Sequence, residues 1–271
     1  MDSESPLVPV HEQNRRAWDE MVRHRQGFTR PATDDDFADP LRTVDGLGWL
    51  GQSIRGKELL CLAAGGGRQS ALYAAAGARV VVVDISPAML ALDRQVAQER
   101  SLDVRTVQAS MDDLRIFSNG QFDIVIQPVS SCYVPSVIKV YQEVARVTRP
   151  DGIYVSQHKQ PGSLQGSVTP SLHGFELVEP YYREGPLRMV HGSRHREEGT
   201  LEYLHRWEEL LGGMCRAGFL IEDLVEPFHA LPNAAVGSFA YRCRFLPPYV
   251  RIKARRRSNK SATLFVGPAE S

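Results

Sequence analysis

The chain has 271 residues, of which 42% are hydrophobic and 24% are charged, as in an ordinary globular protein. Lysine plus arginine equals aspartate plus glutamate at 32 each, so net charge gives no reason to expect a polyanionic partner. No apolar run approaches the roughly 20 residues that cross a bilayer, and the acidic start MDSESP does not resemble a signal peptide. No membrane partner is therefore expected.

The N-terminal 46 residues look like an appendage to the main domain. The spacing of Ala17, Trp18, Met21 and Val22 predicts a helix over 14–25 with one apolar face, followed by a Pro- and Asp-rich loop over 29–40. This segment is a candidate lid over a binding site.

From about residue 56, apolar strands alternate with helices. Strands are expected over 58–64, 78–84, 104–110, 122–127 and 152–159, and helices over 68–77, 86–100 and 134–148. Ser86 is the expected N-cap of the second of these helices, with Pro87 at its first position. Continuous apolar strands separated by helices predict a mostly parallel, doubly wound α/β sheet that is covered on both faces.

The pattern breaks after the fifth strand. Residues 161–199 are irregular and predict a cap inserted into a main domain that spans 47–250. A helix over 201–218, a strand over 219–227 and an antiparallel strand near 238–246 would bring the sheet to seven strands. Residues 251–271 read as a basic C-terminal tail.

Two apolar strands frame a glycine-rich turn. Leu59–Ser70 reads LLCLAAGGGRQS, and Val80–Leu90 reads VVVVDISPAML, which places Asp84 19 positions after Gly65. Such a turn lets the backbone approach a ligand closely, and an acid at the end of the second strand can accept hydrogen bonds from ribose hydroxyls. The pattern therefore predicts a site for a nucleoside cofactor.

Two cofactors compete for this turn. A nicotinamide dinucleotide site requires GxGxxG, and here Gly65, Gly67 and Ser70 fill those positions, so the third glycine is missing. S-adenosylmethionine has no pyrophosphate and needs only a turn for its amino acid portion, a carboxylate for its ribose and a pocket for adenine.

The motifs LLCLAAGGG, VVVVD, QASMDDL, FDIVIQPVS and EVARVTRPDG, in this order, resemble the class I S-adenosylmethionine-dependent methyltransferases, and especially the methyltransferase type 11 branch. The resemblance covers about residues 59–155. It implies a Rossmann-like sheet and S-adenosylmethionine as cofactor, with S-adenosylhomocysteine as product.

The resemblance also assigns candidate cofactor-binding residues. The loop with Ala63, Gly65 and Gly67 would hold the methionine portion, Asp84 the ribose, and Ile85 one face of adenine. Ser110 and Met111 would border adenine, and Gln127 would offer its backbone near the methyl group. Two of the departures from the family pattern lie in this loop region: Cys61 replaces a frequent acid and Ala63 a frequent glycine.

Methyl transfer requires alignment of the acceptor, and a general base only when the acceptor must lose a proton. His158, at the end of the fifth strand, is the expected base if one is used. The other candidates on the acceptor side are Tyr133, Tyr181, Tyr182, His191, His195, His205 and Trp207.

The sequence thus predicts transfer of a methyl group from S-adenosylmethionine to a small-molecule acceptor by in-line displacement. Three alternatives stay open: an NAD(P)-dependent oxidoreductase, a non-catalytic cofactor-binding scaffold, and an RNA methyltransferase that uses the basic run 251–260. The four cysteines, Cys61, Cys132, Cys215 and Cys243, are scattered without a CxxC pair, which predicts reduced thiols, no metal site and a cytoplasmic location.

Overall fold

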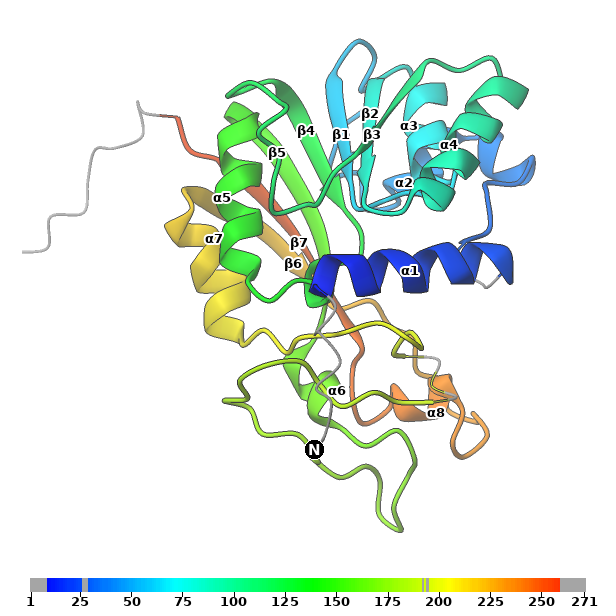
Figure 1. The fold of residues 1–271 in the computed structure, drawn as a ribbon, viewed down its shortest axis with the longest axis vertical. Coiled ribbons are helices and arrows are strands. Elements are labelled where there is room, and N and C mark those ends of the chain that lie inside the picture. The colour runs from blue at the N-terminus through cyan, green and yellow to red at the C-terminus, as the bar shows by residue number, and fades with distance from the viewer. Residues whose placement is uncertain (1–8, 26–28, 192, 194, 259–271) are drawn as a thin grey trace, which may run out of the picture.

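A seven-stranded sheet forms the centre of the molecule (Figure 1). The computed structural model describes residues 9–25, 29–191, 193 and 195–258. The strands are β1 (Glu58–Leu62), β2 (Arg79–Asp84), β3 (Val104–Gln108), β4 (Phe122–Gln127), β5 (Thr148–Lys159), β6 (Phe219–Val225) and β7 (Tyr249–Arg256). Their spatial order is β3-β2-β1-β4-β5-β7-β6. Strands β1 to β5 are parallel to one another, and β7 is antiparallel to both β5 and β6, which confirms the predicted fold class.

The position predicted for the last strand is wrong. Within the expected 238–246 segment the chain forms a short helix, α8 (Phe239–Arg242), and the strand is β7. In β7 the buried residues Val250, Ile252 and Ala254 alternate with arginine and lysine, so the period of two is present but hidden in a basic run. Residues 251–256 therefore belong to the sheet, and the expected tail does not begin at Arg251.

Helices cover both faces of the sheet, because alternate strand residues point to opposite sides. On one face α5 (Val137–Val147) and α7 (Gly213–Arg216) pack over residues such as Leu60, Val125 and Tyr154. On the other face α3 (Gln69–Ala75) and α4 (Pro87–Glu99) cover residues such as Leu59, Val82 and Ile124, beside the short α2 (Pro40–Val44). The Ser86 hydroxyl accepts the Met89 amide at 3.0 Å, which confirms the predicted N-cap of α4.

The predicted helix over 201–218 begins later than expected. A short π-helical segment, η4 (Glu208–Gly212), leads directly into α7, and residues 201–206 are irregular. These residues are instead held against the rest of the protein by long-range hydrogen bonds, including Tyr203 N to Cys132 O at 2.6 Å and Leu201 N to Asn14 Oδ1 at 2.7 Å. Tertiary contacts therefore override the local helical preference here.

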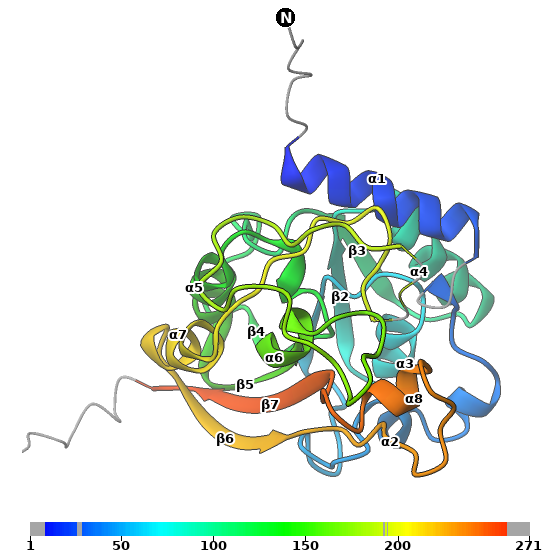
Figure 2. The same ribbon diagram turned by 90° about the horizontal axis from the view of Figure 1, so that it is seen from below.

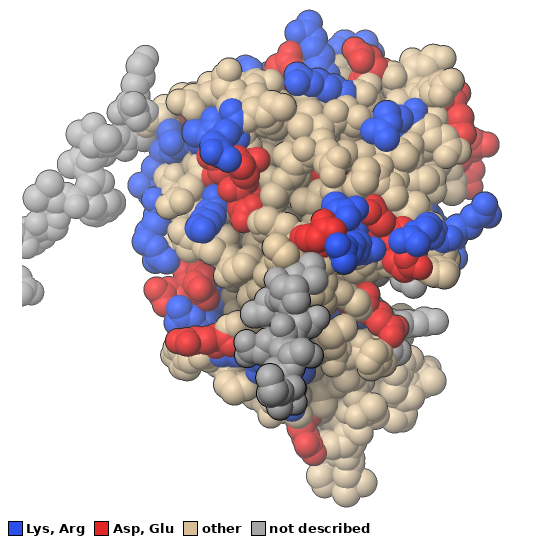
Figure 3. All heavy atoms as spheres, viewed as in Figure 1, with Lys and Arg blue, Asp and Glu red and all other residues tan. Residues whose placement is uncertain are grey.

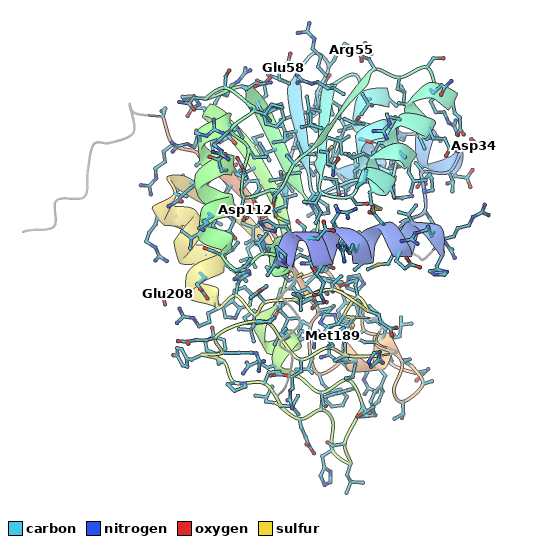
Figure 4. The ribbon with its side chains drawn as sticks, in the orientation of Figure 1. Asp34, Arg55, Glu58, Asp112, Met189 and Glu208 are labelled. Atoms are coloured by element: carbon cyan, nitrogen blue, oxygen red, sulfur yellow. The ribbon has the colours of Figure 1, made fainter. Side chains whose placement is uncertain are left out.

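A helix and an irregular lobe lie beyond one end of the sheet. α1 (Val10–Arg23) crosses this end, and the lobe around α6 (Pro161–Gln165) and α8 lies below α1 (Figures 1 and 2). The carboxyl ends of the parallel strands point toward α1, whereas Arg55 and Glu58, before and at the start of β1, lie at the opposite end (Figure 4). The 3-10 turns η2 (Asp35–Phe37) and η3 (Ser131–Tyr133) complete the assigned elements. None of the described helices is both long and apolar enough to span a membrane.

Positive and negative side chains are interspersed on the face seen in Figure 3, including along α1. In α1, Arg15 pairs with Glu12 at 2.7 Å and with Asp19 at 2.6 Å. Most basic side chains of β7 also have partners within the protein: Lys253 pairs with Glu222 at 3.1 Å, and Arg256 donates a hydrogen bond to Ala145 O at 3.0 Å. This arrangement gives no support to a basic surface for RNA.

Candidate functional site

A cavity of about 370 Å³ lies between the carboxyl ends of the strands, α1 and the cap. In open α/β sheets, ligands bind at this edge, near the point where the strand order reverses. The cavity is lined by Trp18, Arg30, Ala63, Ala64, Gly65, Gly66, Arg68, Gln69, Asp84, Ile85, Met89, Ala109, Met111, Pro128, Val129, Ser130, Tyr133, Gln157, Glu197 and Tyr249.

The glycine-rich loop forms one wall of this cavity. Ala63 has a φ of +48°, a conformation that favours glycine, which explains why the methyltransferase pattern prefers glycine at this position. A Cβ atom on Gly65 would lie 2.7 Å from Met89 Cβ and 2.9 Å from Asp84 Oδ2, so this position requires glycine. The loop therefore passes directly over the strand-end acid.

Asp84 is held rigidly at the end of β2. Its Oδ2 accepts the Gly65 amide at 3.0 Å and its Oδ1 accepts the Ser86 amide at 2.9 Å. Burial raises the pKa of this carboxyl to about 6, although these two hydrogen bonds oppose the shift. Asp84 thus lines the cavity as a fixed hydrogen-bond acceptor with a high proton affinity.

A second carboxylate, Asp93 on α4, supports the loop from behind. Asp93 is fully buried, and it accepts the Gly66 amide at 3.0 Å, the Gly67 amide at 3.1 Å and the Ser70 hydroxyl. Burial raises the pKa of this carboxyl also to about 6. The loop amides that hold a pyrophosphate in dinucleotide sites are therefore occupied by an internal acid, which disfavours NAD(P).

Five of the eight cofactor-site candidates line the cavity, namely Ala63, Gly65, Asp84, Ile85 and Met111. The other three lie just behind its wall. Gly67, with a φ of +73°, shapes the loop. The Ser110 hydroxyl donates to Asp112 at 2.5 Å, and the Gln127 amide donates to Ser130 Oγ at 3.0 Å.

His158 does not face the cavity. Its ring nitrogens are engaged by Ser131 Oγ and Ser156 Oγ, both at 2.8 Å, and the side chain is fully buried. Burial, with the nearby His205, lowers its pKa to about 3. The geometry therefore argues against the expected role of His158 as a general base. Its neighbour Gln157, on the opposite face of the strand, is the residue that reaches the cavity.

Of the remaining acceptor-side candidates, one lines the cavity and the others do not. Tyr133 lines the cavity, whereas His205 is buried with its Nε2 2.9 Å from Ser131 O, and His195 lies in the cap. The others also lie outside the cavity lining, and these are Tyr181, Tyr182, His191 and Trp207.

A buried ionic network closes the cap side of the cavity. Lys159 Nζ lies 2.5 Å from Glu197 Oε2 and 3.1 Å from Glu202 Oε1, and Arg196 Nε lies 3.1 Å from Glu202 Oε2. The Tyr133 hydroxyl donates to Glu197 Oε2 at 2.5 Å. Burial acts to raise the pKa of Glu197, but Lys159 outweighs it, so the pKa lies below its usual range. Glu197 is therefore an ionised acceptor in the cavity wall.

Asn14, a buried side chain of α1, helps to anchor this helix over the cavity. Asn14 Nδ2 donates to Tyr133 O at 2.9 Å and to Leu201 O at 3.1 Å, and Asn14 Oδ1 accepts the Leu201 amide at 2.7 Å. Trp18, one turn further along, lines the cavity and contacts Tyr133 edge-on at a centroid distance of 5.6 Å.

Sequence reasoning missed several of these residues. The sequence did indicate that Asp93 is buried, because it lies three residues after Leu90 and three before Val96, on the apolar face of its helix. Glu197 had no such signal, because it lies in an irregular segment without periodicity, and Glu202 lies in a segment whose pattern predicts a helix that does not form there.

The sheet order, the glycine-rich turn and the acid that closes β2 together define a class I methyltransferase. A family model described as a methyltransferase domain matches residues 60–156. A Bacillus subtilis (strain 168) protein named as the uncharacterized methyltransferase YbaJ is 31% identical over 231 residues, which cover 79% of this chain and 89% of that protein. The chain therefore belongs to the S-adenosylmethionine-dependent methyltransferase family.

Solved structures share the fold. An S-adenosylmethionine-dependent methyltransferase from Mesorhizobium loti aligns with a TM-score of 0.61 at 20% identity, over 78% of this chain and 96% of that one. Geranyl diphosphate C-methyltransferase from Streptomyces coelicolor A3(2), solved with S-adenosylhomocysteine, aligns with a TM-score of 0.63 at 19% identity, over 93% of this chain and all of that one.

Proposed function

We propose that the protein methylates a small-molecule acceptor that binds beside the cofactor in the cavity described above. The observation that carries this proposal is the composition of one continuous cavity: it joins the glycine-rich loop and Asp84 to a second wall of Tyr133, Gln157 and Glu197. Its volume of about 370 Å³ is in the range of small-ligand sites, and α1 and the cap enclose it.

The cofactor half fits S-adenosylmethionine. Asp84 would accept the ribose hydroxyls, Ala63 to Gly66 would hold the amino acid portion, and Ile85 and Met111 would pack on adenine. Gly67, Ser110 and Gln127 would act from behind this wall, through the loop shape and neighbouring backbone. S-adenosylmethionine supplies a methyl group that is already activated by its sulfonium. The protein has to align the acceptor in line with that group and exclude water, which can contribute roughly 7–11 kcal/mol.

On the acceptor side, Glu197 and Tyr133 would orient the substrate. Glu197 is a weak base because Lys159 lowers its pKa, so we assign it to hydrogen bonding with a hydroxyl or ammonium of the acceptor. Tyr133 stays neutral, since burial and Glu197 raise its pKa well above the usual value. The cytoplasmic location inferred from the cysteines stays a prediction.

Titration with S-adenosylhomocysteine tests the proposal. We expect saturable micromolar binding by calorimetry at pH 7.5. Because Asp84 has a pKa of about 6 and only its ionised form can accept from both ribose hydroxyls, affinity should fall about tenfold at pH 5. Asp93 titrates in the same range and acts in the same direction. Saturable binding of NADH in place of S-adenosylhomocysteine would support the oxidoreductase instead.

Binding without methylation of any pool of metabolites would support the scaffold alternative. Methylation of RNA alone would support the RNA methyltransferase. A small-molecule fraction that yields S-adenosylhomocysteine and a radiolabelled product from methyl-labelled cofactor would support the proposal.

We further propose that α1 is a lid, and Asn14→Ala tests this. The change leaves buried backbone groups of Tyr133 and Leu201 unpaired, at a cost of about 1–3 kcal/mol. Amide exchange in α1 should accelerate and affinity for S-adenosylhomocysteine should fall several-fold, because Trp18 loses its position. Gln13→Ala is the matched control, since Gln13 makes only a 3.4 Å bond to Gly199 O. Equal behaviour of the two variants would refute the lid.

A further inference from the structure

Another cavity, of about 270 Å³, lies within the cap, and its lining includes Leu164 of α6, Arg242 of α8 and residues 188–190, 193, 195 and 196. It shares no lining residue with the cofactor cavity. Met189, one of its lining residues, lies in the lobe beyond α1, at the opposite end of the molecule from Arg55 and Glu58 (Figure 4). Its walls are largely apolar and include Leu164, Val168, Val178, Met189 and Val190.

Arg242 of α8 brings a buried positive charge to this cavity. It is 6% exposed, and it donates to Ser163 Oγ at 2.8 Å, Ser163 O at 2.7 Å, Gly166 O at 3.3 Å and Ser167 O at 3.3 Å. All four acceptors are neutral, and no carboxylate of the described residues pairs with Arg242. Burial lowers its pKa to about 10, so it stays charged at neutral pH.

His195 contributes a buried ring nitrogen that has no hydrogen-bond partner. The side chain is 3% exposed, its Nε2 lies 2.9 Å from Ser163 Oγ, and the unpartnered atom is Nδ1. Burial, with Lys159, Arg242 and Arg196, lowers the pKa of His195 and keeps the ring neutral. The Ser163 oxygen accepts from Arg242, and if the Ser163 proton goes to His195 Nε2, the ring carries its own proton on Nδ1; this is the tautomer that an anion site requires.

The other charged groups of this cavity are already matched. Glu179 accepts from Arg183 at 2.7 Å and from Arg188 at 2.8 Å, one on each carboxylate oxygen. Arg196 pairs with Glu202. The unmatched groups that remain are the guanidinium of Arg242 and Nδ1 of His195, and both side chains are joined to Ser163 through their other nitrogens.

We propose that this cap cavity binds a small organic carboxylate with an apolar body. Arg242 has five N–H groups and uses four of them in the hydrogen bonds given above, which leaves one N–H group free to bind a ligand. This N–H group and His195 Nδ1–H would each donate to one oxygen of the bound carboxylate. The apolar wall accepts the rest of the ligand, and the bound anion offsets the buried charge of Arg242. This site is separate from the methyl-transfer site and does not rest on the proposed function.

Calorimetric titration of the full-length protein with benzoate tests the site. We expect saturable binding at pH 7, at least tenfold weaker binding of the neutral isostere benzamide, and a shift of the His195 Nδ1 resonance in ¹⁵N NMR when benzoate binds. Saturating S-adenosylhomocysteine should leave the benzoate affinity unchanged. Inorganic phosphate, which lacks the apolar body, should bind at least tenfold more weakly than benzoate.

Two variants locate the binding. Val190→Trp places a large side chain in the cavity while keeping Arg242, and it should abolish benzoate binding. Leu172→Trp, at a cap residue that is 90% exposed, should not change it. The proposal is overturned if benzoate does not saturate, if benzamide binds equally, if phosphate binds more tightly, if S-adenosylhomocysteine displaces benzoate, or if Val190→Trp binds like the native protein.

Discussion

Asp84→Asn is expected to weaken binding of S-adenosylhomocysteine by roughly 10- to 150-fold. The amide keeps the size of the carboxyl but loses its charge and one acceptor oxygen. Hydrogen bonds to a charged group contribute about 1.5–3 kcal/mol, and each 1.4 kcal/mol is a factor of ten in affinity. Calorimetry at pH 7.5 measures the effect. The affinity of the native protein is expected to fall between pH 7.5 and pH 5, and the part of this fall that Asp84 causes should disappear in the variant.

This variant should remain folded, so its loss of affinity reports on the site. The folded-state pKa of Asp84 is raised from 3.8 to about 6, so the ionised group destabilises the folded protein by about 3 kcal/mol above pH 6, and this cost is lost as the pH falls from about 6 to about 4. Asparagine removes that cost but loses an acceptor for Gly65 or Ser86, which costs about 1–3 kcal/mol. The melting temperature should therefore change little. Asp113→Asn, on an exposed acid outside the cavity, is the matched control and should bind normally.

The cofactor half of the site could be predicted because its determinants are local. A strand, a glycine turn, a helix and a second strand lie within about 25 residues, and the contact between Gly65 and Asp84 follows from that unit. Gly67, Ser110 and Gln127 do not line the cavity, although a residue adjacent to each of them in the sequence does.

His158 shows the same limit on a strand. The sequence indicates that β5 ends at the ligand-binding edge, but not which face of the sheet each residue takes. His158 shares the face of Tyr154 and Ser156, where its ring meets Tyr141 edge-on at 6.2 Å, and Gln157 takes the cavity side. The buried face of β5 carries the polar Ser156 and His158, whereas the half-buried face carries Ile153 and Val155, so the alternation in the sequence does not indicate which face is which.

The acceptor half could not be predicted, because its residues are far apart in the sequence and their local patterns do not bring them together. Tyr133 of η3, Lys159 at the end of β5, Glu197 and Glu202 meet only when the cap folds back on the sheet. A charged residue in an irregular segment is usually at the surface, and only the three-dimensional structure shows that these charges are buried and matched. The cap cavity around Arg242 and His195 was missed for the same reason.

The network also lies between the cofactor cavity and the cap cavity. Glu197 lines the cofactor cavity and Arg196, its neighbour in sequence, lines the cap cavity, while Lys159 and Glu202 join the two. Its stability therefore determines whether the acceptor wall exists at all. Lys159 is the centre of this network, since it contacts both acids.

Lys159→Met is therefore expected to lower the free energy of unfolding by about 3–5 kcal/mol, because it leaves the buried Glu197 without a cationic partner. For a chain of this size the melting temperature should fall on the order of 10 °C, measured by calorimetry or circular dichroism. Glu202 keeps Arg196, so Glu197 carries most of the uncompensated charge. Lys159→Met/Glu197→Gln should consequently recover a large part of the loss, because the second change removes that charge.

Lys253→Met, which breaks a more exposed pair with Glu222 in the adjacent strand, should cost less than about 1 kcal/mol. Equal effects of Lys159→Met and Lys253→Met, or no recovery in the double variant, would show that the network does not hold the cap to the sheet.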